Sequence, residues 1–277
     1  FLMIKHERLE KNTGLLLLFT LAVISIGGLI EIVPLFYIDG SIEEVKKNVT
    51  EVKLDENYKP VLDEDGNAVM VTREVDAIRP YTPLEFLGRN IYVAEGCYNC
   101  HSQQIRPMQD EYERYGHYSL AAESQFDKPF QWGSRRIGPD LARVGGKMDN
   151  QWHVDHLKDP KSRVPASIMP KYPWLAEDDL YYADVKDHLS AARIAGVPYS
   201  KTQEEYEANI ERFGVDVANM LVIDLAAQNL EAQAVAGNYD TNPSRLTKMD
   251  AIVAYLQVLG TMVEFKEDQG IEFSEFR

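Results

Sequence analysis

The longest hydrophobic run lies near the start of the chain. Residues 14–30 contain no charged side chain, and apart from Glu31 the apolar character continues to Ile38. At about 1.5 Å per residue, a helix over residues 14–38 is long enough to cross a hydrocarbon layer of about 30 Å. The pattern therefore predicts one transmembrane helix there, preceded by a short segment, residues 1–13.

Charges on either side of this run predict its orientation. Lys5, Arg8 and Lys11 precede it, and Asp39 follows it. Because Lys and Arg are enriched on the cytoplasmic side of membrane helices, we expect residues 1–13 in the cytoplasm and the rest of the chain in the periplasm, with the helix in a bacterial inner membrane. A cleaved signal peptide is the alternative, but the run is longer than a usual signal core and no A-x-A-like site follows it.

The polar stretch after the anchor predicts a spacer. Residues 39–81 are rich in charged and turn-forming residues, and the sequence Asp-Glu-Asp-Gly-Asn at 63–67 lies between short apolar stretches at 61–62 and 69–71. This alternation is typical of a small hairpin. We expect the spacer to hold the following domain at a distance from the membrane or to orient it.

Helical patterns dominate the remainder of the chain. Thr82, Pro83 and Glu85 have the order of an N-cap, a first-turn proline and a capping box, which predicts a helix over 83–95. A further helical stretch is predicted around 215–234. In residues 248–261 apolar side chains recur on one helical face, namely Met249, Ile252, Val253, Leu256 and Leu259. The predicted fold is mainly α, with one domain over 82–263 and a tail over 264–277.

The first of these helices leads into a motif with specific chemistry. Cys97 and Cys100 are the only cysteines, and His101 follows them, which gives the C-x-x-C-H pattern of c-type haem attachment. The two thiols can bond to the haem and the imidazole can bind its iron. A zinc site would need a second C-x-x-C, and a thioredoxin-like pair would need a βαβ pattern; the sequence has neither. The motif therefore predicts one covalently bound haem c.

A second axial ligand must come from elsewhere in the chain. A methionine thioether suits an electron carrier because it raises the reduction potential. Chain position leaves four of the eight methionines as candidates, Met108, Met148, Met169 and Met220. Met169 is the best placed, because it lies in the proline-bounded loop 167–173. We therefore predict His101 and Met169 as the axial iron ligands.

Two histidines offer an alternative to Met169. His153 and His156 are three residues apart on a predicted helix and could supply a second imidazole ligand or a metal site. The ordinary interpretation is that each is a hydrogen-bonded or exposed helix histidine, and we adopt it here.

Other residues are predicted to support the haem. An axial histidine normally donates its second N–H to an acceptor that fixes the ring, and Pro139 of Gly-Pro-Asp-Leu is our candidate acceptor. Arg135, Arg136 and Arg143 could pair with the haem propionates or lie on the surface, and we select Arg136. The sequence offers no catalytic acid, base or nucleophile, so we expect an electron carrier without a catalytic site of its own.

The net charge of the chain limits the classes of partner that it is expected to bind. The formal net charge is −15, and almost all of it follows the apolar run. Such a surface repels nucleic acid and favours transient encounters with basic or dipolar proteins. It would also serve solubility alone.

Together these features resemble a class I cytochrome c. A closer resemblance is to the mono-haem O subunit of cbb3-type cytochrome c oxidases, and it covers nearly the whole chain, although residues 176–245 match only loosely. The long segment between His101 and Gly138 is typical of that family. The segments that carry the resemblance are residues 88–106, 113–119, 129–144 and 167–175.

The resemblance implies a class I cytochrome c-like periplasmic domain with insertions that relays electrons in aerobic respiration. The donor would be a di-haem cytochrome c subunit or a soluble cytochrome c, and the acceptor would be haem b of the large haem-copper catalytic subunit, where oxygen is reduced. A free membrane-tethered mono-haem cytochrome c is the alternative. A haem-based sensor with a displaceable sixth ligand is a third possibility, and the long segment 102–137 disfavours a nitric oxide reductase subunit.

Overall fold

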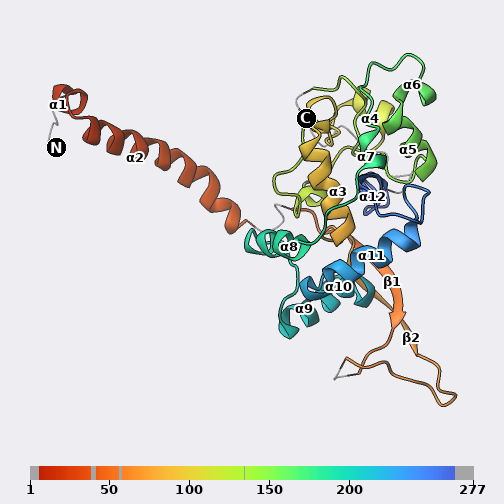
Figure 1. Ribbon diagram of the computed structural model, residues 1–277. Helices are drawn as coiled ribbons and strands as arrows, with labels where there is room; N and C mark the ends of the chain where they lie inside the picture. Colours follow the sequence, from red (N-terminus) through yellow and green to blue (C-terminus); the bar gives the residue numbers. More distant parts are fainter. Residues whose placement is uncertain (1–5, 39–41, 56–57, 134, 266–277) are drawn as a thin grey trace. The chain divides into compact units, whose positions relative to one another are not determined.

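The computed structural model describes residues 6–38, 42–55, 58–133 and 135–265, and it divides into two compact units, residues 1–43 and 44–277. The fold is mainly α with one small sheet in these ranges, as predicted (Figure 1). Lys5 and Asp39, which contributed to the predicted orientation, lie outside the described residues, as does the predicted tail beyond Phe265.

The N-terminal unit is helical. It contains α1 (His6–Glu10), α2 (Thr13–Ile32) and the 3-10 turn η1 (Val33–Phe36). The Asn12 side chain caps α2 by accepting a hydrogen bond from the Leu15 N–H at 3.1 Å. Pro34 has no N–H to donate, so the α-helical hydrogen bonds stop there.

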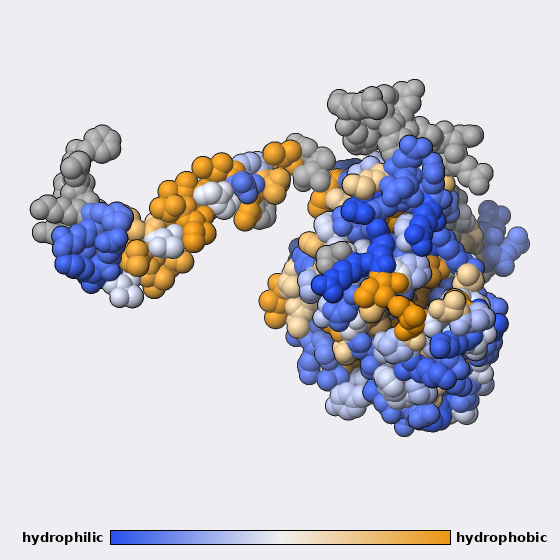
Figure 2. All heavy atoms as spheres, turned by 90° about the horizontal axis from the view of Figure 1, so that it is seen from above, coloured by the Kyte–Doolittle hydropathy of each residue, from blue (hydrophilic) through white to orange (hydrophobic). Residues whose placement is uncertain are grey.

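The span Thr13–Leu35 has a mean hydropathy of 2.5, and it is long and apolar enough to cross a membrane, a test that a signal sequence would also pass. None of the residues of α2 is buried within the protein. Apolar side chains surround the helix on its visible face (Figure 2). A helix without a polar face suits a lipid environment.

The second unit begins with a sheet of two antiparallel strands, β1 (Lys46–Val52) and β2 (Met70–Asp76). Between the two strands the chain reverses direction in the turn at 63–67. There Asp63 Oδ1 accepts hydrogen bonds from the N–H groups of Asp65 and Asn67 at 3.0 and 2.8 Å. Residues 61 and 69 pair as the sequence pattern suggested. The pairing then extends much further, because Met70 and the residues after it pair with β1.

Two long-separated helices form the centre of this unit. They are α3 (Pro83–Ala94), with its Thr82–Glu85 capping box, and α12 (Lys248–Val258). Gly88 allows their close approach, since a Cβ there would overlap the Ala251 carbonyl. The single apolar face predicted for α12 is too narrow. The helix is buried on nearly all sides because α3, α5, α7 and α11 all pack against it.

Shorter elements surround this pair. They are η2 (Cys97–Asn99), α4 (Gln109–Tyr115), η3 (Ala121–Ser124), α5 (Asn150–Lys158), α6 (Pro160–Arg163), α7 (Trp174–Glu177), α8 (Val185–Ile194), α9 (Gln203–Phe213), α10 (Val215–Met220), η4 (Ile223–Leu225) and α11 (Ala226–Gly237). One apolar cluster joins α3 to α8, α9 and α11, and a second joins α3 and α12 to α5 and α7. The second cluster borders the candidate site.

The helix predicted around 215–234 is interrupted. The Ser200 N–H donates to Leu221 O at 3.0 Å, and Ser200 O accepts from the Ile223 N–H at 2.9 Å. These bonds draw Val222 into an extended bridge with Ser200 and separate α10 from α11. Tertiary hydrogen bonds therefore override the local helical preference here.

Candidate haem site

A single turn presents both cysteines and the histidine. Gly96 ends α3 with φ at +71°, a left-handed conformation that favours glycine. The chain then folds into η2, where Cys97 O accepts the N–H groups of Cys100 and His101 at 3.1 and 3.0 Å. Neither cysteine is in a disulfide, and both are half-buried. The two thiols and the imidazole are thus held within one tight turn.

The Cys97 thiol is unsuited to thiolate chemistry. Burial raises its pKa to about 12, and the nearby Glu95 carboxylate adds to this. Reactive cysteines of redox enzymes have lowered pKa values. The site therefore does not resemble a thioredoxin-like pair.

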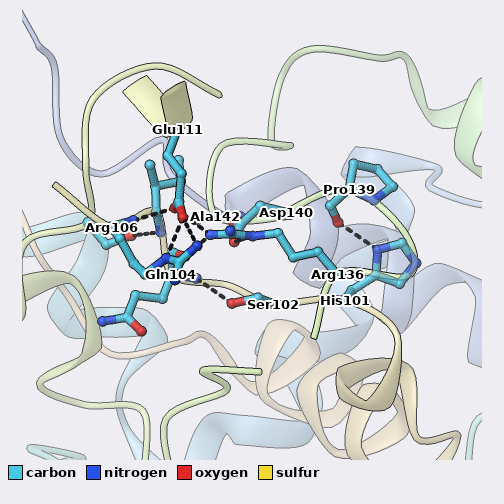
Figure 3. A network of polar contacts seen from close by, with 11 residues as sticks. His101, Ser102, Gln104, Arg106, Glu111, Arg136, Pro139, Asp140 and Ala142 are labelled. Atoms are coloured by element: carbon cyan, nitrogen blue, oxygen red, sulfur yellow. Dashed lines mark hydrogen bonds and ion pairs between the residues drawn. The ribbon is translucent and has the colours of Figure 1, made fainter. Parts of the chain in front are cut away.

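The His101 ring is fixed by the turn that contains Pro139. Its Nδ1 lies 2.8 Å from Pro139 O, and because a carbonyl only accepts, Nδ1 must donate (Figure 3). A side chain at Gly138 would overlap the imidazole, so only glycine permits this approach. Two backbone hydrogen bonds connect the same segments, Gly138 N–H to Cys100 O at 3.0 Å and Leu141 N–H to Ser102 O at 2.8 Å. The ring is left with Nε2 as its free ligand atom.

Arg136 lies at the centre of a polar network behind this turn. Its Nε donates to Asp140 Oδ2 at 3.0 Å, and its Nη2 donates to Gln104 O and to Glu111 Oε2, each at 2.6 Å (Figure 3). Glu111 also accepts from the Arg106 side chain and from the Arg106 N–H at 2.7 Å. The network ties α4 to the segment that carries Pro139.

Glu111 is buried and ionised, with an exposed fraction of 3%. Burial alone would oppose its ionisation, but hydrogen bonds from Arg136 and Arg106 outweigh it and lower its pKa to about 2. The carboxylate therefore stabilises the network over the whole physiological pH range.

Met169 lies half-buried beside the second apolar cluster, which Cys97 and Tyr172 also contact. Its loop is anchored to α5 by the hydrogen bond from the Tyr172 N–H to Leu157 O at 2.8 Å. By contrast, Met108 and Met148 are exposed. The structure thus brings Met169 and the Cys97 turn to one cluster across 72 positions of sequence.

The two α5 histidines are buried or half-buried rather than exposed. His153 is 3% exposed, and its Nε2 has no hydrogen-bond partner among the described residues; the buried Nδ1 of His156 has none either. The His156 ring stacks on Trp152, with centroids 4.7 Å apart and planes inclined by 11°. Burial lowers the pKa of His153 to about 4 and also lowers that of His156, so both rings are neutral at neutral pH.

Comparison with known protein families matches residues 67–263 to the family described as cytochrome c oxidase, mono-heme subunit/FixO. The chain belongs to this family. The matched range includes the Cys97 turn, Pro139 and the Met169 loop, and it confirms the resemblance found in the sequence. No curated protein matches the chain. As a member, this oxidase subunit carries one haem, serves electron transport and associates with other subunits of the oxidase.

The described residues fit a haem. Two thiols free of disulfides, an imidazole whose Nδ1 is already bonded and a half-buried thioether are the donor set of a c-type site. Gly138 lies so close to His101 that a Cβ added at this glycine would displace the imidazole ring. The oxidase subunit therefore has a prearranged ligand in His101.

Sequence reasoning missed the acidic half of this site. Glu111 and Asp140 hold Arg136, which was predicted to contact haem propionates. That role for Arg136 stays a prediction, and its contacts favour positioning of the Pro139 turn. The Arg136–Glu111 pair spans 25 positions, and no local pattern relates these residues.

Proposed function

We propose that this oxidase subunit relays electrons in a cbb3-type terminal oxidase through one haem c bonded to Cys97 and Cys100. The observation that carries the proposal is the His101–Pro139 hydrogen bond, located directly after two free thiols inside the matched mono-haem region. When bound, the haem takes up and releases one electron at its iron.

The protein's own residues hold and tune that group. The two thiols would anchor it, and because Pro139 O fixes the His101 ring through Nδ1, Nε2 would be the atom that binds the iron. Met169 would supply a thioether ligand, which would raise the potential. Arg136 contacts a propionate or, through Asp140, positions the turn.

The proposed electron path lies on the periplasmic side of the membrane. Residues 1–13 lie in the cytoplasm, α2 spans the inner membrane, and the haem domain lies in the periplasm. A di-haem cytochrome c subunit or a soluble cytochrome c donates electrons, and haem b of the large haem-copper subunit accepts them. The acidic surface supports rapid, transient encounters with a basic donor.

Mild detergent extraction of the native complex tests this function. A haem-stained denaturing gel and a reduced-minus-oxidised spectrum are recorded on the same sample. A c-type band on this chain that travels with b-type haem and an oxygen-consuming large subunit supports the proposal. Purification of the chain alone with only c-type haem would instead identify a membrane-tethered shuttle.

The axial ligands are tested by Met169→His. The variant should keep its covalent haem but have a markedly lower reduction potential, because imidazole replaces the thioether. Met148→His, at an exposed methionine, is the matched control and should have the potential of the unmodified protein. An unchanged spectrum and potential in Met169→His would remove Met169 from the site.

A further inference from the structure

Helix α5 carries Trp152 and His156, and one buried ring nitrogen of His156 has no hydrogen-bond partner among the described residues. Trp152 and His156 are four positions apart and so lie on the same side of the helix, where their rings stack. Val154 and Leu157 occupy the buried face that packs on α12. The stack fixes the orientation of the His156 ring, while its buried Nδ1 has no partner among the described residues.

A buried polar atom without a partner is costly, at about 1–3 kcal/mol. Such atoms in native proteins nearly always have a partner in the protein, in ordered water or in a bound group. For His156 Nδ1, no partner is present among the described residues, so a water or a bound group must supply it.

Helix α5 borders the candidate haem site, because Val154 and Leu157 belong to the apolar cluster that Cys97 and Met169 also contact. The Met169 loop is attached to the same helix through the Tyr172–Leu157 hydrogen bond, and to Asp159, directly after the helix, through the Lys171–Asp159 ion pair at 2.9 Å. The helix that carries His156 is therefore next to the segments that carry the two proposed axial ligands.

Haem brings two carboxylates that need donors, and two of the three arginines considered for this role are already engaged. Arg136 is shared by Glu111 and Asp140, and Arg143 is paired with Glu123, whereas Arg135 is exposed. A neutral imidazole N–H is a suitable donor to a carboxylate in a site where a further cation is not supplied.

We propose that His156 is a positioning residue of the haem site, whose Nδ1–H donates a hydrogen bond to a haem propionate while Trp152 holds the ring in place. The inference rests on the proposed function, since it requires haem at the Cys97 turn. It assigns to α5 a contact with a haem propionate, a role that the sequence analysis gave to Arg136.

The test uses the full-length chain with its haem and the variants His156→Phe, His156→Gln and His188→Phe. Phenylalanine preserves the stack on Trp152 but removes both ring nitrogens, whereas glutamine retains a donor. His188 on α8 is exposed and paired with Asp184, so it serves as the matched control. The measurements are the haem content, the equilibrium redox titration of the c-type band and the propionate bending band in the resonance Raman spectrum.

We expect His156→Phe to keep its covalent haem while the ratio of ferrous to ferric haem at a fixed applied potential falls roughly fivefold, the worth of an ordinary hydrogen bond. The direction follows because a propionate without its donor carries more exposed negative charge, which favours the ferric state. The propionate band should shift, His156→Gln should recover part of both changes, and His188→Phe should show neither.

An unaltered potential and propionate band in His156→Phe would overturn the inference. So would a change confined to the absorption of the thioether–iron bond, since that would place His156 against Met169 instead. If His156→Phe fails to fold, the glutamine variant decides the matter by its Raman band. Absence of covalent haem from the unmodified chain would refute the proposed function itself, which is a distinct result.

Discussion

At the scale of single residues, the site depends on one histidine ring held by backbone. The carbonyl of Pro139 and the missing side chain of Gly138 together define where the His101 imidazole lies. A backbone acceptor cannot be removed by mutating its own side chain, so the glycine is the better point at which to perturb the ring.

Gly138→Ala should displace the His101 ring, because the added methyl group overlaps the imidazole. Overpacking of this kind costs about 1–3 kcal/mol. We expect reduced covalent haem and loss of the low-spin spectrum, measured by haem staining and absorption. Gly28→Ala, where a Cβ meets nothing within 4 Å, is the control. A low-spin spectrum of normal intensity in Gly138→Ala would show that the ring has room after all.

Glu111 contributes stability that depends on pH. Its folded-state pKa of about 2 is below its ordinary value of 4.5, so the contribution is fully present above about pH 4.5 and is lost as the pH falls through 2. We expect Glu111→Gln to lower the free energy of unfolding by about 2 kcal/mol at pH 7, the worth of a hydrogen bond to a charged group, and by much less near pH 2, measured by urea denaturation.

Glu205 is the matched control for Glu111. Its pKa is likewise lowered to about 2, chiefly by the hydrogen bond from Arg193, but its side chain is 33% exposed. Solvent screening limits such pairs to about 1 kcal/mol or less. Equal losses in Glu111→Gln and Glu205→Gln would mean that burial does not strengthen the network as argued.

Some residues of the site could be predicted from the sequence, and the contacts of others could not. Cys97, Cys100 and His101 lie within five consecutive residues, so their haem-binding chemistry could be predicted from the sequence motif alone. The Pro139 acceptor could be named because the ring of an axial histidine needs one. The contacts of Arg136 could not, since they depend on how α4 folds back against the Asp140 turn.

At the scale of elements, the helices with strong local signals were predicted well. The capping box at Thr82 and Glu85 places the start of α3 at the predicted residue. The break between α10 and α11 was missed because it is imposed by Ser200, which lies outside the predicted helix. The burial of α12 on nearly all sides was missed, because the spacing of apolar residues predicts only one buried face. In the structure four helices pack against α12 and bury the other faces as well.

Gly88→Ala tests the central helix pair. The new Cβ would overlap the Ala251 carbonyl, so α3 and α12 must move apart. We expect a destabilisation of about 1–3 kcal/mol, seen as a lower melting temperature of the haem domain. Gly27→Ala in α2 adds the same methyl group to open space and should leave that temperature unchanged. If both variants melt like the unmodified protein, the two helices tolerate a wider spacing than their packing indicates.

At the scale of the whole molecule, the two units have separable tasks. Residues 44–277 contain all of the buried apolar clusters found among the described residues, whereas α2 buries none of its side chains. A chain of residues 44–277 behind a cleavable leader should therefore fold without detergent. Because the Cys97 turn belongs to this unit, it should also carry covalent haem with the reduction potential of the full-length chain. Aggregation in the absence of detergent, with full recovery on adding it, would show that the haem domain itself contacts lipid. A soluble domain lacking haem, beside a full-length chain that has it, would show that the anchor is needed to deliver the protein for haem attachment.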